Sequence, residues 1–159
     1  MAKVLIFYYS RGGATAEMAK YVAEGARGVA GAQVTVKSVD KVEPKDLLDY
    51  DALICGSPTY YGLMAGEIKI FFDQTVTLHG QLEGKVGGAF TSSANLAGGN
   101  ETTILSILEV MIIHGMIVQG TSQRDHYGPV ALGAPDERAI GECRKLGNNV
   151  AALAKRLFG

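Results

Sequence analysis

Short apolar runs alternate with helical patterns along the whole chain, and this alternation constrains the fold more than any other feature. The run "KVLIFYY" at residues 3–9 is continuous, as in a strand buried on both faces of a sheet. Further runs indicate strands at residues 33–39, 51–57, 85–93 and 115–120, and helical patterns occupy residues 14–30, 66–76, 100–113 and 135–158. This order predicts a single doubly wound α/β domain over residues 1–159, with a five-stranded parallel sheet and helices on both faces.

Composition agrees with one globular domain and argues against several functions. Hydrophobic residues make up 47% of the 159 residues, and the net charge of −1 supplies no basic surface for nucleic acid or an anionic membrane. The apolar N-terminal run is too short to span a membrane. Cys55 and Cys143 are far apart and fall in predicted buried elements, which indicates free thiols and a cytoplasmic protein. His79, His114 and His126 lack zinc-site spacing, so we expect no metal site.

The loop after the first strand, "SRGGAT", is a candidate phosphate site. Ligands of doubly wound sheets bind beyond the carboxyl ends of the strands. Glycines let the backbone curl around an anion, and the start of the following helix supplies unpaired N–H groups. The alternative is an ordinary turn in which Ser10 or Thr15 caps the helix. The candidate residues are Ser10, Arg11, Gly12, Gly13, Ala14 and Thr15.

The loop after the third strand, "GSPTYYG", places two adjacent tyrosines at the same edge of the predicted sheet. Exposed aromatic rings favour a flat ligand that stacks on them. The alternative is that one tyrosine packs on the rim of the sheet and the other is solvated. The candidate residues are Pro58, Thr59, Tyr60, Tyr61 and Gly62.

The loop after the fourth strand, "FTSSANLAGGN", is rich in small residues and leaves many backbone N–H groups free. Such donors suit the carbonyl oxygens and ring nitrogens of a heterocycle, although a mobile surface loop is the alternative. A phosphate cradle, an aromatic platform and a donor-rich loop at one edge together describe a mononucleotide with a flat ring, and FMN fits that description. The candidate residues here are Thr91, Ser92, Ser93, Ala94, Asn95, Gly98 and Gly99.

Four segments carry a resemblance to a known family. They are "AKVLIFYYSRGGATAEMAKYVAEGA", "YDALICGSPTYYGLMAGEIKIFFDQT", "GKVGGAFTSSA" and "IIHGMIV", in order over nearly the whole chain. Together they resemble the flavodoxin-like WrbA-type NAD(P)H:quinone oxidoreductases. The resemblance implies a flavodoxin fold with strand order 2-1-3-4-5, bound FMN, and two-electron reduction of quinones by a reduced nicotinamide.

The resemblance also implies roles for single residues. Residues 10–15 would surround the FMN phosphate, residues 59–61 would border the isoalloxazine, and residues 91–95 would meet its pyrimidine edge. His114, in the family-like "HGM", would lie beside the reactive face of the flavin and give a proton to the quinone, with Tyr127 as a helper. Composition alone favours a buried structural role for His114.

This chain departs from the family pattern at four places, one of which is the third loop, poorer in glycine and one residue longer. Gly12 and Ala14 replace an aromatic residue and a histidine of the phosphate loop, and Tyr60 and Leu63 replace an arginine and an asparagine of the second loop. The segment "DKVEPKDLL" after the second strand is shorter than in larger members. The altered loops border the face of the flavin ring where nicotinamide and quinone would stack.

Two function classes remain open at this point. The first is the quinone reductase, and the second is a flavodoxin that carries electrons between redox proteins. Flavodoxins tend to be strongly acidic, so a net charge of −1 disfavours the carrier, whereas the shortened segment favours it. The apolar surface of "IKIFF" and of residues 104–113 exceeds what one sheet face needs, which indicates a homo-oligomer or, alternatively, a well-filled core.

Overall fold

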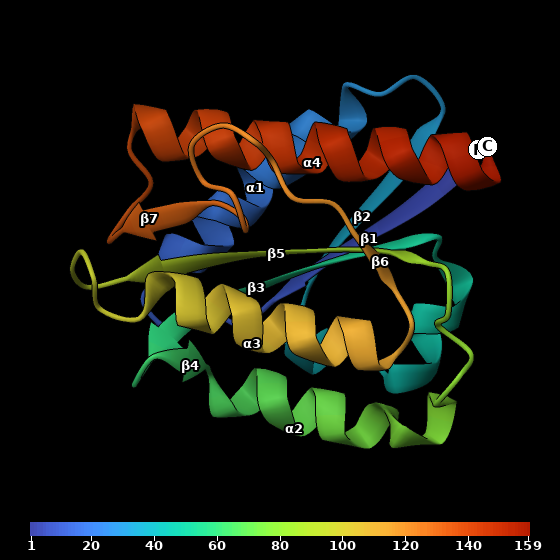
Figure 1. Ribbon diagram of the computed structural model, residues 1–159, viewed down its shortest axis with the longest axis horizontal. Coiled ribbons are helices and arrows are strands. Elements are labelled where there is room, and N and C mark those ends of the chain that lie inside the picture. Colours follow the sequence, from blue (N-terminus) through green and yellow to red (C-terminus); the bar gives the residue numbers. More distant parts are fainter.

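The computed structural model describes all 159 residues, and a parallel sheet forms its centre. Five parallel strands run in the order β2-β1-β3-β5-β6, which confirms the predicted order 2-1-3-4-5 (Figure 1). Two short strands extend this sheet: β4 pairs antiparallel with β3, and β7 pairs with the carboxyl end of β5. The strands are β1 (Ala2–Tyr8), β2 (Ala32–Ser38), β3 (Ala52–Tyr60), β4 (Leu63–Met64), β5 (Val86–Ser93), β6 (Ile117–Val118) and β7 (Val130–Leu132).

Helices cover both faces of the sheet. In Figure 1, α1 (Ala14–Arg27) and α4 (Glu137–Phe158) lie on one face, and α2 (Gly66–Gln74) and α3 (Asn100–Ile113) lie on the other. Three 3₁₀ turns complete the chain, at Val39–Lys41, Pro44–Asp49 and Thr75–Leu78. None of the helices combines the length and the apolar character that crossing a membrane would need.

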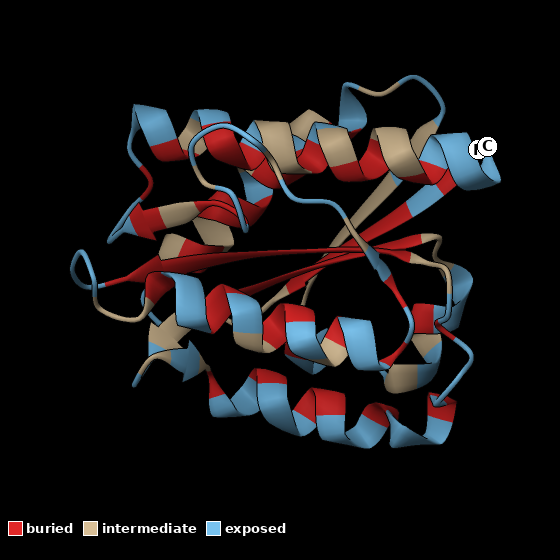
Figure 2. Ribbon diagram, viewed as in Figure 1, coloured by how far each residue is buried: buried red, intermediate tan, exposed pale blue.

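Burial on both faces explains the continuous apolar run of β1. Val4 and Ile6 pack toward α1 and α4, whereas Leu5 and Phe7 pack toward α2 and α3, because successive side chains of a strand point to opposite faces. The central strands are accordingly buried along most of their length (Figure 2). The Phe7 ring lies 5.3 Å from that of Phe71 on α2.

Two glycines let α1 and α4 approach each other closely. A Cβ on Gly25 would overlap the carbonyl of Arg144, and one on Gly147 would overlap the carbonyl of Val22. Only glycine fits at these two positions, so the first and the last helix of the chain meet backbone to backbone. An ion pair of 2.8 Å between Arg144 and Glu24 lies beside this contact.

Some predicted boundaries differ from the structure. The third strand continues to Tyr60 because its end folds back on β4 as a hairpin, and the predicted fifth strand shortens to the two residues of β6. The last helix begins at Glu137, where the Asp136 carboxylate accepts the Ala139 N–H at 2.8 Å. Cys55 and Cys143 are free and buried, as expected, and burial raises the pKa of both thiols, to about 12 for Cys143.

Candidate functional site

The carboxyl ends of β1, β3 and β5 bring the three predicted loops to one hollow of about 540 Å³. Twelve of the eighteen predicted cofactor residues line it, while Tyr61, Gly62, Thr91, Asn95, Gly98 and Gly99 lie around it without forming its wall. The lining residues are Ser10, Arg11, Gly12, Gly13, Ala14, Thr15, Pro58, Thr59, Tyr60, Ser92, Ser93 and Ala94, together with Glu17, Gly133 and Ala134.

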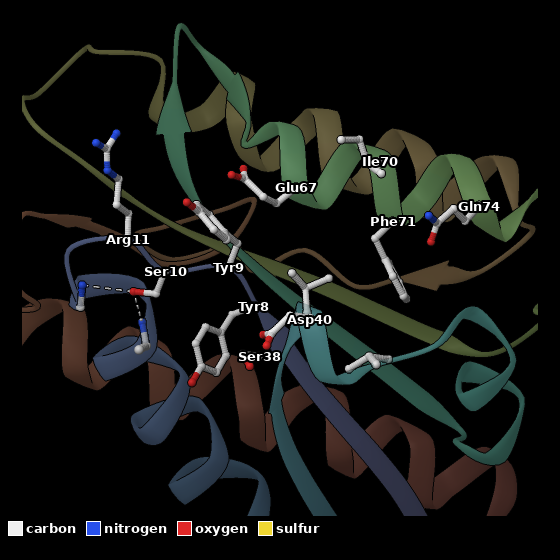
Figure 3. A pocket seen from close by; sticks show the side chains of 14 residues that line it. Tyr8, Tyr9, Ser10, Arg11, Ser38, Asp40, Glu67, Ile70, Phe71 and Gln74 are labelled. Atoms are coloured by element: carbon white, nitrogen blue, oxygen red, sulfur yellow. Dashed lines mark hydrogen bonds between the residues drawn. The ribbon is translucent and has the colours of Figure 1, made fainter.

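Ser10 holds the first loop in shape. Its Oγ accepts the N–H groups of Gly13 and Ala16, both at 3.2 Å (Figure 3). Gly13 precedes α1 with φ of 100°, a left-handed conformation that suits glycine. Gly13 is the N-cap of α1, and Ser10 accepts the Ala16 N–H of its first turn from three residues before the cap. The Ser10 hydroxyl hydrogen remains free to donate to a ligand.

The same loop also has the properties of an anion cradle. The N–H groups of Arg11, Gly12, Ala14 and Thr15 donate to no group of the protein. A Cβ on Gly12 or Gly13 would meet nothing within 4 Å, so the outer side of the loop is open. Unpaired donors at the start of a 14-residue helix favour a negatively charged ligand. The geometry therefore fits a terminal phosphate group.

Thr15 ties the cradle to the neighbouring strand. It is buried, and its Oγ1 lies 2.9 Å from the Oγ of Ser92 at the end of β5. Only one hydroxyl hydrogen can lie between these two oxygens, so the other is available to a ligand. Thr15 thus connects the first and third loops in addition to lining the hollow.

The two tyrosines of the second loop have different environments. Tyr61 and Gly62 form the turn of the β3–β4 hairpin with φ of 49° and 77°, as expected for a tight two-residue hairpin. Tyr60 is 38% exposed and lines the hollow, whereas Tyr61 is fully exposed. One ring therefore stands at the wall of the site and the other in solvent.

The third loop is fastened to this hairpin. A Cβ on Gly99 would overlap the Cα of Gly62, and Gly99 has φ of 98°, so the contact requires glycine. Thr102 Oγ1 donates to the carbonyl of Gly62 at 2.6 Å, and the side chain of Asn100 donates to Ser93 Oγ. The second and third loops consequently form one connected wall.

Thr91 and Asn95 both use their polar side chains in hydrogen bonds to the backbone of the chain, Thr91 in the interior and Asn95 at the surface. Thr91 is fully buried, and its hydroxyl donates to the carbonyl of Ser57 at 2.7 Å. Asn95 donates to the Leu96 carbonyl at 3.0 Å. The N–H groups of Ala94 and Asn95 remain without a partner, as the sequence of this loop predicts.

The structure corrects the expectation for His114. This residue follows the last turn of α3, and β6 after it pairs with the first residues of β5, so His114 lies at the amino edge of the sheet. The 14 residues of α3 separate it from the hollow by about 20 Å. Its Nε2 lies 2.8 Å from Thr75 Oγ1, which itself donates to Phe72. Within one chain His114 therefore has the buried structural role that composition favoured.

Tyr127 lies near the hollow but outside it. Half of this residue is exposed, and it lines a neighbouring cavity of about 390 Å³ together with Leu96 and Asn100. No sequence pattern pointed to Glu17, Gly133 or Ala134, which also line the hollow; Gly133 and Ala134 follow β7. The short run "PVALGAP" could have indicated β7, because its three apolar residues, 130–132, are preceded by a proline and followed by a glycine.

Comparison with known proteins gives one family match and two relatives with different names. Residues 5–107 match the family described as "Flavodoxin domain". A "Flavodoxin" of Aquifex aeolicus is 41% identical, with 95% of this chain and 86% of that protein covered. An "NAD(P)H dehydrogenase (quinone)" of Archaeoglobus fulgidus is 36% identical, with 99% of this chain and all of that protein covered.

A solved structure has the same fold as this chain. The flavodoxin, WrbA-like protein of Agrobacterium tumefaciens is 28% identical, superimposes with a TM-score of 0.83, and covers 98% of this chain and 99% of its own. The matched residues 5–107 include all three loops of the hollow. The chain therefore belongs to the flavodoxin domain family.

Proposed function

We propose that this chain binds FMN in the hollow at the carboxyl edge of the sheet and reduces quinones with electrons from NAD(P)H. Membership of the flavodoxin domain family implies FMN as the cofactor. FMN supplies redox chemistry that no amino-acid side chain offers, and the protein binds, orients and shields it. The observation that carries the proposal is the open cradle at residues 10–15, with its four unpaired N–H groups.

The phosphate would lie in the cradle. The N–H groups of Arg11, Gly12, Ala14 and Thr15 would donate to its oxygens, and Ser10 would add its hydroxyl while it keeps the loop in shape. No lysine stands in the wall of the hollow, which suits a phosphate that is held and not transferred.

The flavin ring would lie between the second and third loops. Thr59 and Tyr60 would border one side of it, and the free N–H groups of Ala94 and Asn95 would face its polar edge. Such donors stabilise negative charge on the reduced ring, because a preorganised N–H group costs no reorganisation when the charge develops. Tyr127, half exposed in the neighbouring cavity, would donate a hydrogen bond to a quinone oxygen.

Two observations support an enzyme. The relative named NAD(P)H dehydrogenase (quinone) matches this chain over nearly all of both lengths. The net charge of −1 also lacks the strong acidity that steers a carrier to basic partners.

The second candidate is an electron carrier without a substrate of its own. The relative named flavodoxin, at 41% identity, supports it. The shortened segment after β2 supports it too.

A homo-oligomer remains part of the proposal. Ile70 of α2 and Ile112 and Ile113 of α3 are 61%, 59% and 71% exposed, and exposed apolar side chains of this kind would suit contact with a second copy of the chain. Sedimentation velocity tests this point directly: a single species of 16.8 kDa would refute it.

A spectrum followed by a reduction assay tests the function. Purified protein should be yellow, and NADH or NADPH should bleach the flavin absorbance and then support turnover with a quinone. Tyr127→Phe should lower quinone turnover while nicotinamide still bleaches the flavin. If dithionite bleaches the flavin but neither nicotinamide does, the carrier is the correct assignment.

A further inference from the structure

A second and larger cavity lies on the other side of the cradle loop. It has a volume of about 700 Å³, within the range of roughly 300–1,000 Å³ that is usual for ligand pockets. Figure 3 shows it between the end of β1, the residues that follow β2, and the side chains of α2. No sequence pattern predicts this cavity, and the hollow proposed for FMN does not include most of its residues.

The walls of this cavity combine an apolar side with charged groups. Tyr9 and Phe71 contribute aromatic rings to it, and Asp40 and Glu67 contribute carboxylates. Burial and the nearby carboxylate of Glu67 raise the pKa of Tyr9, so its phenol stays protonated. Asp40 and Arg11 form no ion pair or side-chain hydrogen bond with any protein group. Both charges are thus available to a ligand.

The cavity adjoins the cofactor hollow at the phosphate loop. Ser10, Arg11 and Gly13 line both of them, so a ligand in the cavity lies against the outer side of the phosphate loop. Arg11 lines both spaces, and in Figure 3 its guanidinium extends outward, away from the other labelled side chains. A single extended molecule reaching from the cavity toward the flavin would therefore pass this guanidinium.

We infer that the cavity binds the ADP half of the nicotinamide substrate, and this inference rests on the proposed function. Adenosine offers a flat ring for Tyr9 and Phe71 and ribose hydroxyls for Asp40, and its diphosphate suits the guanidinium of Arg11. Asp40 follows β2, and an acidic side chain in the second βα unit of other α/β dinucleotide sites accepts a hydrogen bond from the ribose 2′-hydroxyl.

The same carboxylates select between the two nicotinamide cofactors. NADPH carries a phosphate of charge about −1.5 to −2 on the ribose 2′-oxygen. That phosphate would face Asp40 and Glu67, and no lysine or arginine other than Arg11 lines the cavity. The protein therefore uses NADH in preference to NADPH.

Two substitutions at Asp40 and a matched control test the inference. The wild-type protein should show a KM for NADPH at least tenfold above that for NADH. Asp40→Asn should narrow this ratio and Asp40→Arg should invert it, because each removes the repulsion and the arginine attracts the 2′-phosphate. Asp49→Asn makes the same charge change at the opposite edge of the sheet, where Asp49 lies beside Lys3, and should leave the ratio as it is. FMN affinity should stay within twofold in all three variants.

Calorimetry of the FMN-loaded protein gives a readout that does not depend on turnover. ADP should bind, ADP with an added 2′-phosphate should bind at least tenfold more weakly, and Asp40→Arg should reverse this order. If NADH reduces the flavin but the Asp40 variants behave like Asp49→Asn, the inference is wrong and the proposed function stands. If neither nicotinamide reduces the flavin, the proposed function fails, and calorimetry then decides: ADP binding that depends on Asp40 supports the cavity assignment, and its absence overturns it.

Discussion

Replacing Gly12 by aspartate places a negative charge in the cradle without disturbing the fold. Gly12 has no left-handed φ, and a Cβ at this position would meet nothing within 4 Å, so the side chain fits without strain. An acidic group beside the start of α1 also stabilises the helix by about 0.3–1 kcal/mol. Loss of FMN in this variant would therefore not result from unfolding.

The exposure of Gly12 and the charge of the phosphate determine the size of the effect, for two charges taken as about 5 Å apart. Two unit charges about 5 Å apart interact by roughly 3 kcal/mol at an effective dielectric constant of about 20, and by about 1 kcal/mol in water. Gly12 is exposed, so the interaction lies between these limits, and the phosphate carries a charge of about −1.5 to −2. We expect Gly12→Asp to weaken FMN binding by about 2–4 kcal/mol, or roughly 30- to 1,000-fold.

Fluorescence titration of the apoprotein measures this loss, with two controls. Gly12→Asn has nearly the same shape without the charge, and riboflavin is FMN without the phosphate. The aspartate variant should bind FMN much more weakly than the asparagine variant, both should bind riboflavin equally, and salt should narrow the difference in FMN affinity. Equal FMN affinities of the two variants, or an equal loss of riboflavin, would show that the phosphate does not lie in this loop.

Three further predictions concern the wall of the site and the stability of the fold. Gly99→Ala should weaken FMN and riboflavin by the same factor, because it separates the two loops proposed to hold the ring; a loss confined to FMN would contradict this. Gly147→Ala should lower the free energy of unfolding by about 1–3 kcal/mol through overlap with α1, whereas Gly141→Ala, on the same helix with open space around it, should raise it by up to about 1 kcal/mol in urea denaturation. Burial and the nearby His79 lower the pKa of His114. The unfolded chain therefore binds a proton at His114 near pH 6.5, where the imidazole of the folded chain remains neutral. Stability should therefore fall on acidification from pH 7.5 to 5.5, and it should fall less in His114→Asn; equal losses would refute the assignment.

The alternation of strands and helices made most of the fold predictable, because continuous apolar runs and helical periodicity report burial directly. The predicted helix at residues 100–113 coincides with α3, whereas β4 and β7 escaped notice. These two strands contain two and three residues, too few for any periodicity to show. They depend on pairing with the ends of β3 and β5, and this pairing cannot be inferred from the local sequence.

The candidate site was predictable where its residues directly follow strands that the sequence predicts. Residues directly after parallel strands share one edge, so the loops at residues 10–15 and 58–62 had to be neighbours. His114 follows a helix, and the same rule places it at the opposite edge; the resemblance alone suggested otherwise. The cavity beside Asp40 depends on how the side chains of α2 face the turn after β2, and a long-range arrangement of this kind leaves no pattern in the sequence.

The backbone contact between α1 and α4 has a consequence for the phosphate loop. The cradle stands at the start of α1, and α1 owes part of its packing surface to α4. A chain in which α4 cannot dock would therefore expose an apolar face of α1 directly behind the phosphate loop. A substitution that weakens the helix contact, far from the hollow, should accordingly also weaken flavin binding.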